Sequence, residues 1–177
     1  MTEFSKMQRL KRRFFAMRNG ITADALRRAG QPFRVIFGLN MPQLREIAGE
    51  FGPDEELARE LWANRSTRES MLLAPMLIKP DGFSDGLLWL SESPTPEVTD
   101  ILCHSLLRHL PDAEKIAYEA AASTDAMTRY GAIRLAYNLL NSGNKAAAIS
   151  IAEGLAADPD KRVSTTAARL IDDASYL

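Results

Sequence analysis

The sequence predicts an all-α fold, and the prediction rests on its composition, its helix-capping signals and a weak internal repeat. Ala, Leu, Arg and Glu are abundant, β-branched residues are sparse, and only 7% of the 177 residues are aromatic. Such a composition favours helices, because these side chains lose little conformational freedom there. Asn, Asp, Ser, Thr, Gly and Pro recur at short intervals and mark successive helix ends, so no sheet is needed anywhere.

Two short helices are expected at the start of the chain. The first runs to about Arg18 and stops at the Asn-Gly pair of residues 19–20. We expect Thr22 to cap the second helix, which ends at Gly30, because a hydroxyl accepts well from free N–H groups and glycine suits a helix end. The segment QPFRVIFGLN, residues 31–40, has a strand-like composition, but its proline and glycine favour a loop.

Three helices with recognisable starts follow. Asn40 is expected to cap MPQLREIAGEF, with Pro42 in the first turn, where a missing N–H costs nothing. PDEELARELWAN comes next, and STRESMLLAPMLI opens with a capping box formed by Ser66 and Glu69. Pro75 should kink this last helix or end it early. Six further helices are expected near residues 84–91, 96–109, 112–122, 126–140, 144–157 and 161–174.

A weak repeat links the last part of the chain to a known architecture. The segments MTRYGA (127–132) and VSTTAA (163–168) superimpose with a shift of 36 residues, and an aspartate-containing turn precedes each. That shift suits one antiparallel helix pair of a HEAT-like solenoid, in which each pair buries its apolar face against its neighbours. We therefore predict an α-α superhelix of about ten or eleven helices, forming a single HEAT-like repeat domain over residues 1–177. A plain helical bundle is the alternative.

Composition argues against several classes of protein. The longest central apolar run, MLLAPMLI, is too short to span a membrane, and the charged start does not resemble a secretory signal. Cys103 is the only cysteine, so no internal disulfide is possible and the cytoplasm is the expected location. Two histidines five residues apart do not form a metal-site pattern, and no glycine-rich phosphate loop is present. We expect neither a metal nor a cofactor.

Positive charge is concentrated in the first quarter of the chain. Residues 1–45 carry ten basic and two acidic residues, a net +8, whereas the remainder carries 12 basic and 21 acidic residues, a net −9. This asymmetry favours contact with a polyanion, and double-stranded DNA is the expected partner. For any single arginine, a solvated helix surface is the alternative. The candidate nucleic-acid-binding residues in this region are Lys11, Arg12, Arg13, Arg27 and Arg28.

The segment TPEVTDILCHSLLRHL, residues 95–110, has two lines of side chains at helical spacing. The polar line consists of Asp100, His104 and Arg108, and the apolar line of Val98, Leu102 and Leu106. We expect the apolar line to face the core, with Cys103 beside it as an inert thiol, and the polar line to face solvent or a groove.

Residues 36–78, IFGLNMPQLREIAGEFGPDEELARELWANRSTRESMLLAPMLI, contain four motifs in order. These are an FGV-like turn, a Pro-x-Leu-Arg-x-Ile-Ala helix, a Leu-Ala-x-x-Leu-Trp helix and a helix started by a glutamate. The run resembles the DNA alkylation repair family of HEAT-like repeat DNA glycosylases, and the upstream MRNGITADALRRAG is similar to a short subgroup. The resemblance covers roughly residues 8–140. It implies a HEAT-like fold and excision of cationic N3- or N7-alkylated purines from DNA.

The resemblance also implies a catalytic carboxylate, which stabilises the oxocarbenium-like sugar as the glycosidic bond breaks. The family motif of a tryptophan, three residues and an aspartate aligns with residues 96–100, so Asp100 keeps the carboxylate and Pro96 replaces the tryptophan. A Trp-x-Arg-Arg run aligns with residues 127–130. Met127 replaces its tryptophan, and Arg129 remains as a candidate contact to a DNA phosphate. A third family aromatic has no counterpart in VSTTAARLIDDASYL.

Three functions are compatible with these residues. We prefer a divergent member that binds nucleic acid with weak or no glycosylase activity, because the missing aromatic rings are the groups that would recognise a cationic base. One alternative is an active alkylpurine DNA glycosylase in which Asp100 works with Tyr130 as a substitute aromatic. The other is a HEAT-like scaffold for a protein partner. The remaining large aromatic residues, expected to pack rather than to stack on bases, are Trp62, Trp89, Phe33 and Phe37.

Overall fold

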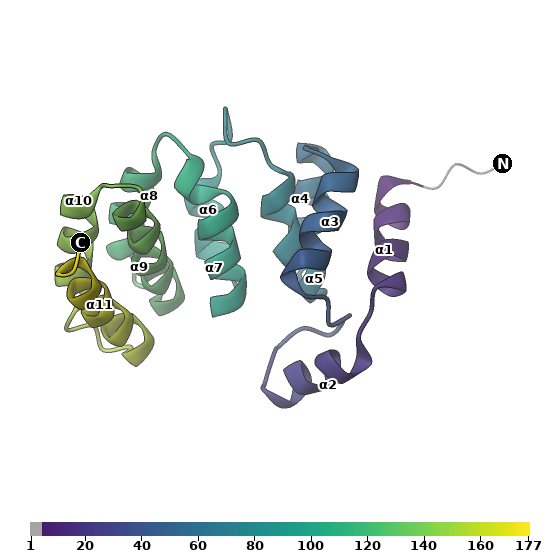
Figure 1. Cartoon of the computed structure of the whole chain (residues 1–177), viewed down its shortest axis with the longest axis horizontal. Coiled ribbons are helices and arrows are strands. Elements are labelled where there is room, and N and C mark those ends of the chain that lie inside the picture. The colour runs from purple at the N-terminus through teal and green to yellow at the C-terminus, as the bar shows by residue number, and fades with distance from the viewer. Residues whose placement is uncertain (1–4) are drawn as a thin grey trace. The chain divides into compact units, whose positions relative to one another are not determined.

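The computed structural model describes residues 5–177, and this part of the chain contains eleven α-helices, two 3-10 helices and no strand (Figure 1). The all-α prediction is confirmed. Residues 1–4, which begin the segment expected to be helical up to Arg18, lie outside the described residues. The chain divides into two compact units, Met1–Lys79 and Pro80–Leu177. The expectation of a single domain over residues 1–177 stays a prediction.

The N-terminal unit contains five α-helices and one 3-10 helix. They are α1 (Lys6–Ala16), α2 (Gly20–Arg28), α3 (Met41–Phe51), α4 (Glu55–Ala63), α5 (Arg68–Leu73) and the 3-10 helix η1 (Ala74–Leu77). The predicted capping box of α3 forms, because Asn40 Oδ1 accepts from the Gln43 N–H and the Gln43 side chain accepts from the Asn40 N–H, both at 3.0 Å. Pro75 lies in η1, so α5 ends early as predicted.

Two of the predicted helix starts were wrong. Asn19, and not Thr22, caps α2, because its side-chain oxygen accepts from the Thr22 N–H at 3.1 Å. The predicted capping box of Ser66 and Glu69 does not form either, since α5 begins after Thr67 without a side-chain cap. Glu69 is fully buried and accepts hydrogen bonds from the loop that precedes α3. Three hydrogen bonds from loop N–H groups stabilise this carboxylate more than one hydrogen bond from an N–H group at the helix end would.

The segment 31–40 is a loop, as predicted, and it is held in place at both ends. Val35 forms one isolated parallel bridge with Thr67. Gly38 has a φ of +79°, and a Cβ added there would overlap the carbonyl oxygen of Asn19 and lie 2.8 Å from the Ala23 nitrogen. Only glycine therefore fits this close approach between the loop and α2.

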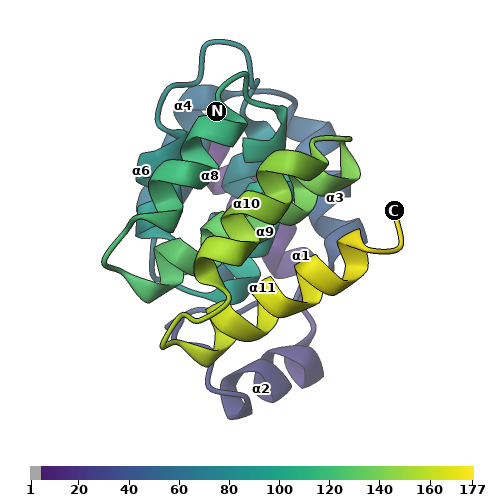
Figure 2. The ribbon, with the colours of Figure 1, turned by 90° about the vertical axis from the view of Figure 1, so that its left-hand side faces the viewer.

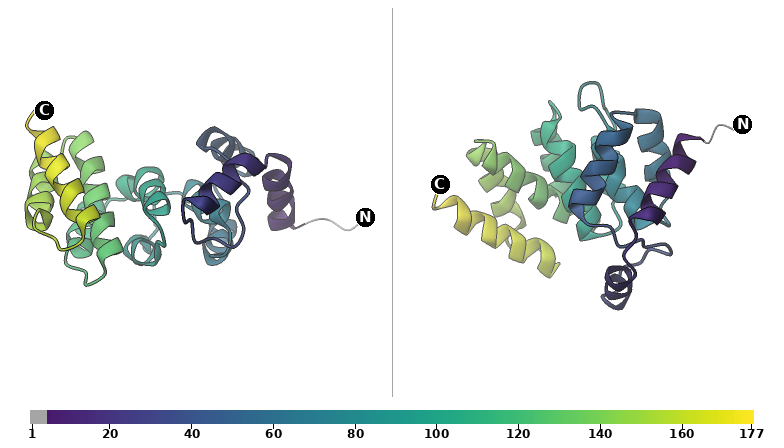
Figure 3. Two further views of the ribbon diagram at one scale, coloured as in Figure 1. Left: turned by 90° about the horizontal axis from the view of Figure 1, so that it is seen from below. Right: turned by 45° about the vertical axis from the view of Figure 1, so that its right-hand side comes forward.

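The C-terminal unit is built from two layers of helices. Its elements are α6 (Gly86–Glu92), α7 (Pro96–Ser105), the 3-10 helix η2 (Leu107–His109), α8 (Ala113–Ala121), α9 (Ala126–Asn141), α10 (Lys145–Leu155) and α11 (Lys161–Ala174). Helices α6, α8 and α10 pack side by side in one layer, and α7, α9 and α11 form the other (Figure 2). Figure 3 shows the same helices in two further views. The alternation of paired helices is the arrangement expected of a solenoid.

The helix expected over residues 96–109 breaks near its end, which corrects that prediction. Helix α7 stops at Ser105, and η2 continues the chain with tighter turns. The change of geometry allows the adjacent residues Leu106 and Leu107 both to be fully buried, which a regular surface helix does not permit for neighbours. Arg108 consequently lies on η2 and not on α7.

The two helix starts of the internal repeat lie 35 residues apart, at Asp125 and Asp160, which corrects the shift of 36 residues expected from the sequence. Asp125 caps α9 by accepting from the Thr128 N–H at 2.8 Å, and Asp160 caps α11 by accepting from the Arg162 N–H at 2.9 Å.

In the described part of the chain, no helix combines the length and apolar character needed to cross a membrane.

Candidate functional site

Asp100 lies in the second turn of α7, and the start of that helix sets its position. Thr95 is the N-cap and its hydroxyl accepts from the Val98 N–H at 3.3 Å. Pro96 occupies the first turn, where proline fits because that position needs no N–H donor. The residue that replaces the family tryptophan therefore starts the helix, and it offers no aromatic face to a base.

The two lines of side chains on α7 face opposite ways, as predicted. Val98 and Leu102 are fully buried on α7, and so is Leu106 at its end. Asp100 retains 36% of its side-chain exposure, and His104 is exposed. Arg108 is also exposed, although it lies on η2. The phase of the apolar residues thus places the Asp100 carboxylate at the surface of the α7–α9–α11 layer.

The carboxylate of Asp100 is held by two side chains of α9. Tyr130 Oη donates a hydrogen bond of 2.9 Å to Asp100 Oδ1. Arg134 Nε lies 2.8 Å from the same oxygen as an ion pair, although its N–H is not aligned for a hydrogen bond. Burial raises the pKa of Asp100 above its ordinary value, while Arg134 and Tyr130 act in the opposite direction. Tyr130 was expected beside Asp100 from the sequence, whereas Arg134 was not, although its spacing of four residues from Tyr130 places both on one face of α9.

A shallow pocket of about 320 Å³ lies beside this carboxylate. Its aromatic lining is Tyr137, and no tryptophan contributes to it. The Tyr137 ring already faces the Arg134 guanidinium, with 5.6 Å from Cζ to the ring centroid, and its hydroxyl donates to Asp173 at 2.9 Å. The pocket therefore presents a carboxylate that is already neutralised and an aromatic ring that already faces a cation. The residues that line it are Asp100, Ile101, His104, Arg134, Tyr137, Asn138 and Asn141.

Arg129 makes a network within the C-terminal unit. Its Nε and Nη2 donate to the carboxylate of Asp158 at 2.6 and 3.1 Å, and its Nη1 donates to the carbonyl oxygens of Ser123 and Thr124. The Arg129 guanidinium in turn lowers the pKa of Asp158 below its ordinary value. This arginine joins the turn before α9 to the turn before α11.

Arginine is paired with aspartate at several places in the α7–α9–α11 layer. Besides the pairs of Arg129 and Arg134, Arg162 Nη2 lies 3.1 Å from Asp160 Oδ2. The C-terminal unit carries 8 basic and 14 acidic residues, a net −6. Such a surface offers little attraction to a phosphate backbone.

The N-terminal unit has the opposite balance, with 14 basic and 9 acidic residues and a net charge of +5. Of the candidate residues on α1, Lys11 and Arg12 are exposed, and Arg13 binds Glu46 and Glu50 of α3. On α2, Arg27 pairs with Asp24 at 3.0 Å. Arg28 is exposed next to it, at the end of the same helix. The candidate basic residues of this unit therefore lie on two consecutive helices, whereas Asp100 and Arg129 belong to the C-terminal unit.

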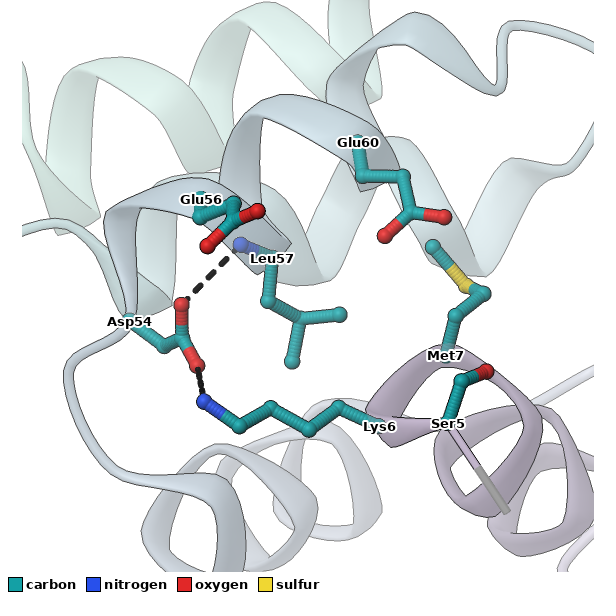
Figure 4. Close-up of a pocket in the computed structure, with 7 residues that line it drawn as sticks. All are labelled: Ser5, Lys6, Met7, Asp54, Glu56, Leu57 and Glu60. Carbon is teal, nitrogen blue, oxygen red and sulfur yellow. Dashed lines mark hydrogen bonds and ion pairs between the residues drawn. The ribbon is translucent and has the colours of Figure 1, made fainter. Parts of the chain in front are cut away.

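A pocket of about 230 Å³ between α1 and α4 does not suit DNA (Figure 4). Its rim carries the carboxylates of Asp54, Glu56 and Glu60, which repel a phosphate. Lys6 Nζ lies 2.6 Å from Asp54, and this contact lowers the pKa of the carboxyl group. No group of three or more His, Cys, Asp or Glu side chains suited to a metal ion occurs among residues 5–177.

The four aromatic residues expected to pack, Trp62, Trp89, Phe33 and Phe37, lie against the interior, and so does the cysteine. Trp62 and Phe33 are buried, and Trp89 is buried against Phe83 with 5.1 Å between ring centroids. Phe37 is half-buried against Phe14. Cys103 is fully buried with its thiol 3.7 Å from the Gly131 carbonyl oxygen, and burial raises its pKa.

Comparisons with known proteins agree with this fold. A family model described as DNA alkylation repair enzyme matches residues 10–175, which extends well beyond the region of the sequence motifs. A solved structure is similar with a TM-score of 0.77 and 16% identity, over 92% of this chain and 72% of that one. That structure is described as a new family of proteins related to the HEAT-like repeat DNA glycosylases with affinity for branched DNA structures. No curated protein matches the sequence.

Proposed function

This chain belongs to the DNA alkylation repair enzyme family, and from that premise we propose that it is a DNA-binding member with little or no base-excision activity. The observation that carries the proposal is the state of Asp100. Its carboxylate is hydrogen-bonded by Tyr130 and ion-paired with Arg134, and Pro96 and Met127 replace the two family tryptophans. An electrostatic stabiliser works only when it is oriented toward the developing charge. Here Asp100 is oriented toward α9.

Binding to DNA is supported by charge and by family. The N-terminal unit carries the net +5, and its exposed residues Lys11 and Arg28 are available for phosphate contacts. A solved structure of the same fold is described as having affinity for branched DNA. Phosphate contacts need no aromatic wall, so binding survives the loss of the groups that recognise a damaged base. The single buried thiol suits action in the cytoplasm.

Fluorescence anisotropy with a labelled DNA duplex tests the binding. We expect weak binding that falls steeply between about 50 and 200 mM salt. Lys11→Ala and Arg28→Ala should each weaken binding to all duplex sequences and reduce the salt slope by about 1. The matched control is Lys145→Ala, an exposed lysine at the start of α10, which should bind as the natural chain does. Binding that is absent, insensitive to salt or unaffected by both variants would leave a protein-interaction scaffold as the better description.

Release of methylated bases tests the chemistry. With the protein in excess over duplex DNA that contains N7-methylguanine or N3-methyladenine, we expect release at the level of the uncatalysed reaction. Asp100→Asn serves as the control, because it keeps the size of the side chain and removes its charge. Release that is well above background and disappears in Asp100→Asn would make this protein an active alkylpurine glycosylase and contradict the proposal.

A further inference from the structure

We propose that the N-terminal unit binds an unpaired nucleobase of DNA in a second pocket, formed by α1, the loop of residues 31–40 and the turn between α4 and α5. This inference rests on the proposed function, because it requires the chain to bind DNA. The pocket has a volume of about 420 Å³, within the range of sites that bind small ligands. It combines aromatic rings, fixed polar groups and a cation.

The aromatic part of the pocket comes from α1 and the loop. Phe14 is fully buried and its ring centroid lies 5.6 Å from that of Phe37, in a tilted arrangement. Phe15 is 58% exposed, which is unusual for so large an apolar side chain. The Arg18 guanidinium covers one face of the Phe15 ring, with Cζ 3.8 Å from the centroid. An exposed ring next to a cation is the kind of platform on which an unpaired base stacks.

The polar part comes from the turn after α4. Ser66 Oγ lies 3.2 Å from Asn64 Oδ1, and the Asn64 amide nitrogen donates to the hydroxyl oxygens of Thr67 and Ser70 at 3.3 and 3.1 Å. These bonds fix the orientation of the Asn64 amide at the pocket wall. Because both Asn64 amide N–H bonds and the Ser66 hydroxyl hydrogen are donated within the turn, the free lone pairs of Asn64 Oδ1 and Ser66 Oγ can accept hydrogen bonds from donor groups on the edge of a base.

The walls of the pocket are held in place before any ligand arrives. The Val35 N–H donates to the Ser66 carbonyl oxygen at 2.9 Å, and this contact joins the loop to the turn. The buried Glu69 carboxylate accepts from the Phe37 and Gly38 N–H groups at 3.0 and 2.9 Å. A loop anchored in this way loses little freedom on binding, which favours affinity.

Charge identifies the occupant as part of a nucleic acid. The exposed Lys11 lines the pocket and belongs to the unit with the net charge of +5. An uncharged apolar ligand would form no ion pair with this ammonium group. A nucleotide whose base stacks on Phe15 carries a phosphate that can lie close to Lys11. The other pocket of this unit, at Asp54, lacks aromatic lining and carries three carboxylates, so it suits neither a stacked base nor a phosphate.

The experiment compares two labelled duplexes, one fully paired and one with a single unpaired nucleotide in its centre. The full chain should bind the second duplex more tightly, and Phe15→Ala should reduce that preference by about tenfold, the order expected for one base stacked on an aromatic ring. Phe15→Tyr should retain the preference. Lys11→Ala should weaken both duplexes equally, because its contact is to phosphate. Tyr118→Ala, which removes an exposed aromatic residue of α8, is the matched control and should leave the affinity for both duplexes unchanged.

Each outcome decides the inference. Equal affinity for both duplexes, or a preference that Phe15→Ala leaves intact, overturns it while the proposed DNA binding stands. Binding to the duplex with the unpaired nucleotide alone, lost in Phe15→Ala, supports the inference and contradicts the proposed binding of paired DNA. If the protein binds neither duplex, both the inferred base-binding pocket and the proposed DNA binding are wrong.

Discussion

Tyr130 Oη donates a hydrogen bond of 2.9 Å to Asp100 Oδ1, and this contact joins α9 to α7 at the residue that the family motif assigns to catalysis. The tyrosine therefore does not act as an aromatic wall opposite the carboxylate. It binds the carboxylate directly, by a polar contact between adjacent helices.

Tyr130→Phe removes this hydrogen bond and keeps the ring. We expect a loss of about 1 kcal/mol in the free energy of unfolding at neutral pH, the usual value of one such bond at a half-exposed site. The pKa of Asp100, which burial already raises, should rise further because Tyr130 is one of the groups that lower it. Since the folded variant then holds the Asp100 proton more tightly than the folded natural chain does, the difference in stability between the two should shrink as the pH falls. Denaturant unfolding at pH 7 and pH 4 measures both effects, and an equal loss at the two pH values would argue against this account.

The pair formed by Arg129 and Asp158 also predicts a cost of mutation that declines as the pH falls. The pKa of Asp158 lies below its ordinary value of 3.8, chiefly because of the hydrogen bond from Arg129. Its contribution to stability is therefore complete above pH 3.8 and is lost as the pH falls through the lowered pKa. Arg129→Met should cost about 2 kcal/mol at pH 7 and much less near pH 2. The control is Arg162→Met, which removes a more exposed pair and should cost less than about 1 kcal/mol.

Glu69 supports the loop of residues 31–40 and not a helix start. Glu69→Ala leaves the N–H groups of Phe37 and Gly38 and the guanidinium of Arg68 without this acceptor, so we expect a cost of about 3 kcal/mol. Glu60→Ala, an exposed glutamate of α4, should change the free energy of unfolding by less than about 0.5 kcal/mol. Thermal unfolding of the full chain measures both, and similar values for the two variants would contradict the assigned role of Glu69.

Gly38 and Gly30 allow the cost of an unfavourable backbone conformation to be distinguished from the cost of steric overlap. Both have positive φ values, of +79° and +86°, but only at Gly38 does an added Cβ meet other backbone atoms, those of Asn19 and Ala23. Gly30→Ala should therefore cost about 1 kcal/mol, the penalty for the backbone conformation alone. Gly38→Ala should cost about 3 kcal/mol, because steric overlap is added to that penalty. Equal costs in chemical denaturation would mean that the loop moves freely away from α2.

Cys103 should be unreactive while the protein is folded. Its side chain is fully buried and its pKa is raised, chiefly by burial, so almost no thiolate is exposed to a reagent at pH 8. Because the sequence contains a single cysteine, labelling with a thiol reagent reports this site alone. We expect labelling to be slow in the native protein and fast in denaturant. Rapid labelling without denaturant would show that α7 opens readily.

The sequence by itself determined the features that depend on neighbouring residues. The helices, the cap at Asn40, the early end at Pro75 and the inward phase of Val98 and Leu102 all involve positions within a few residues of one another. Capping, proline geometry and helical periodicity act over such distances, so a reading of the chain in order predicts them. The family could also be identified, because its motifs lie in ordered local segments.

Only the tertiary structure decided which partners the candidate site residues have. Tyr130 lies 30 residues from Asp100, Arg129 lies 29 residues from Asp158, and Glu69 lies 31 residues from Gly38. The sequence contains many polar and charged residues that could pair with a given charged side chain. The packing of the helices decides which of them lies close enough to do so. For that reason the sequence could name Asp100, Arg129 and Glu69 as notable residues, but it could not show that Arg134 neutralises the first, that Asp158 binds the second, or that the third anchors a loop.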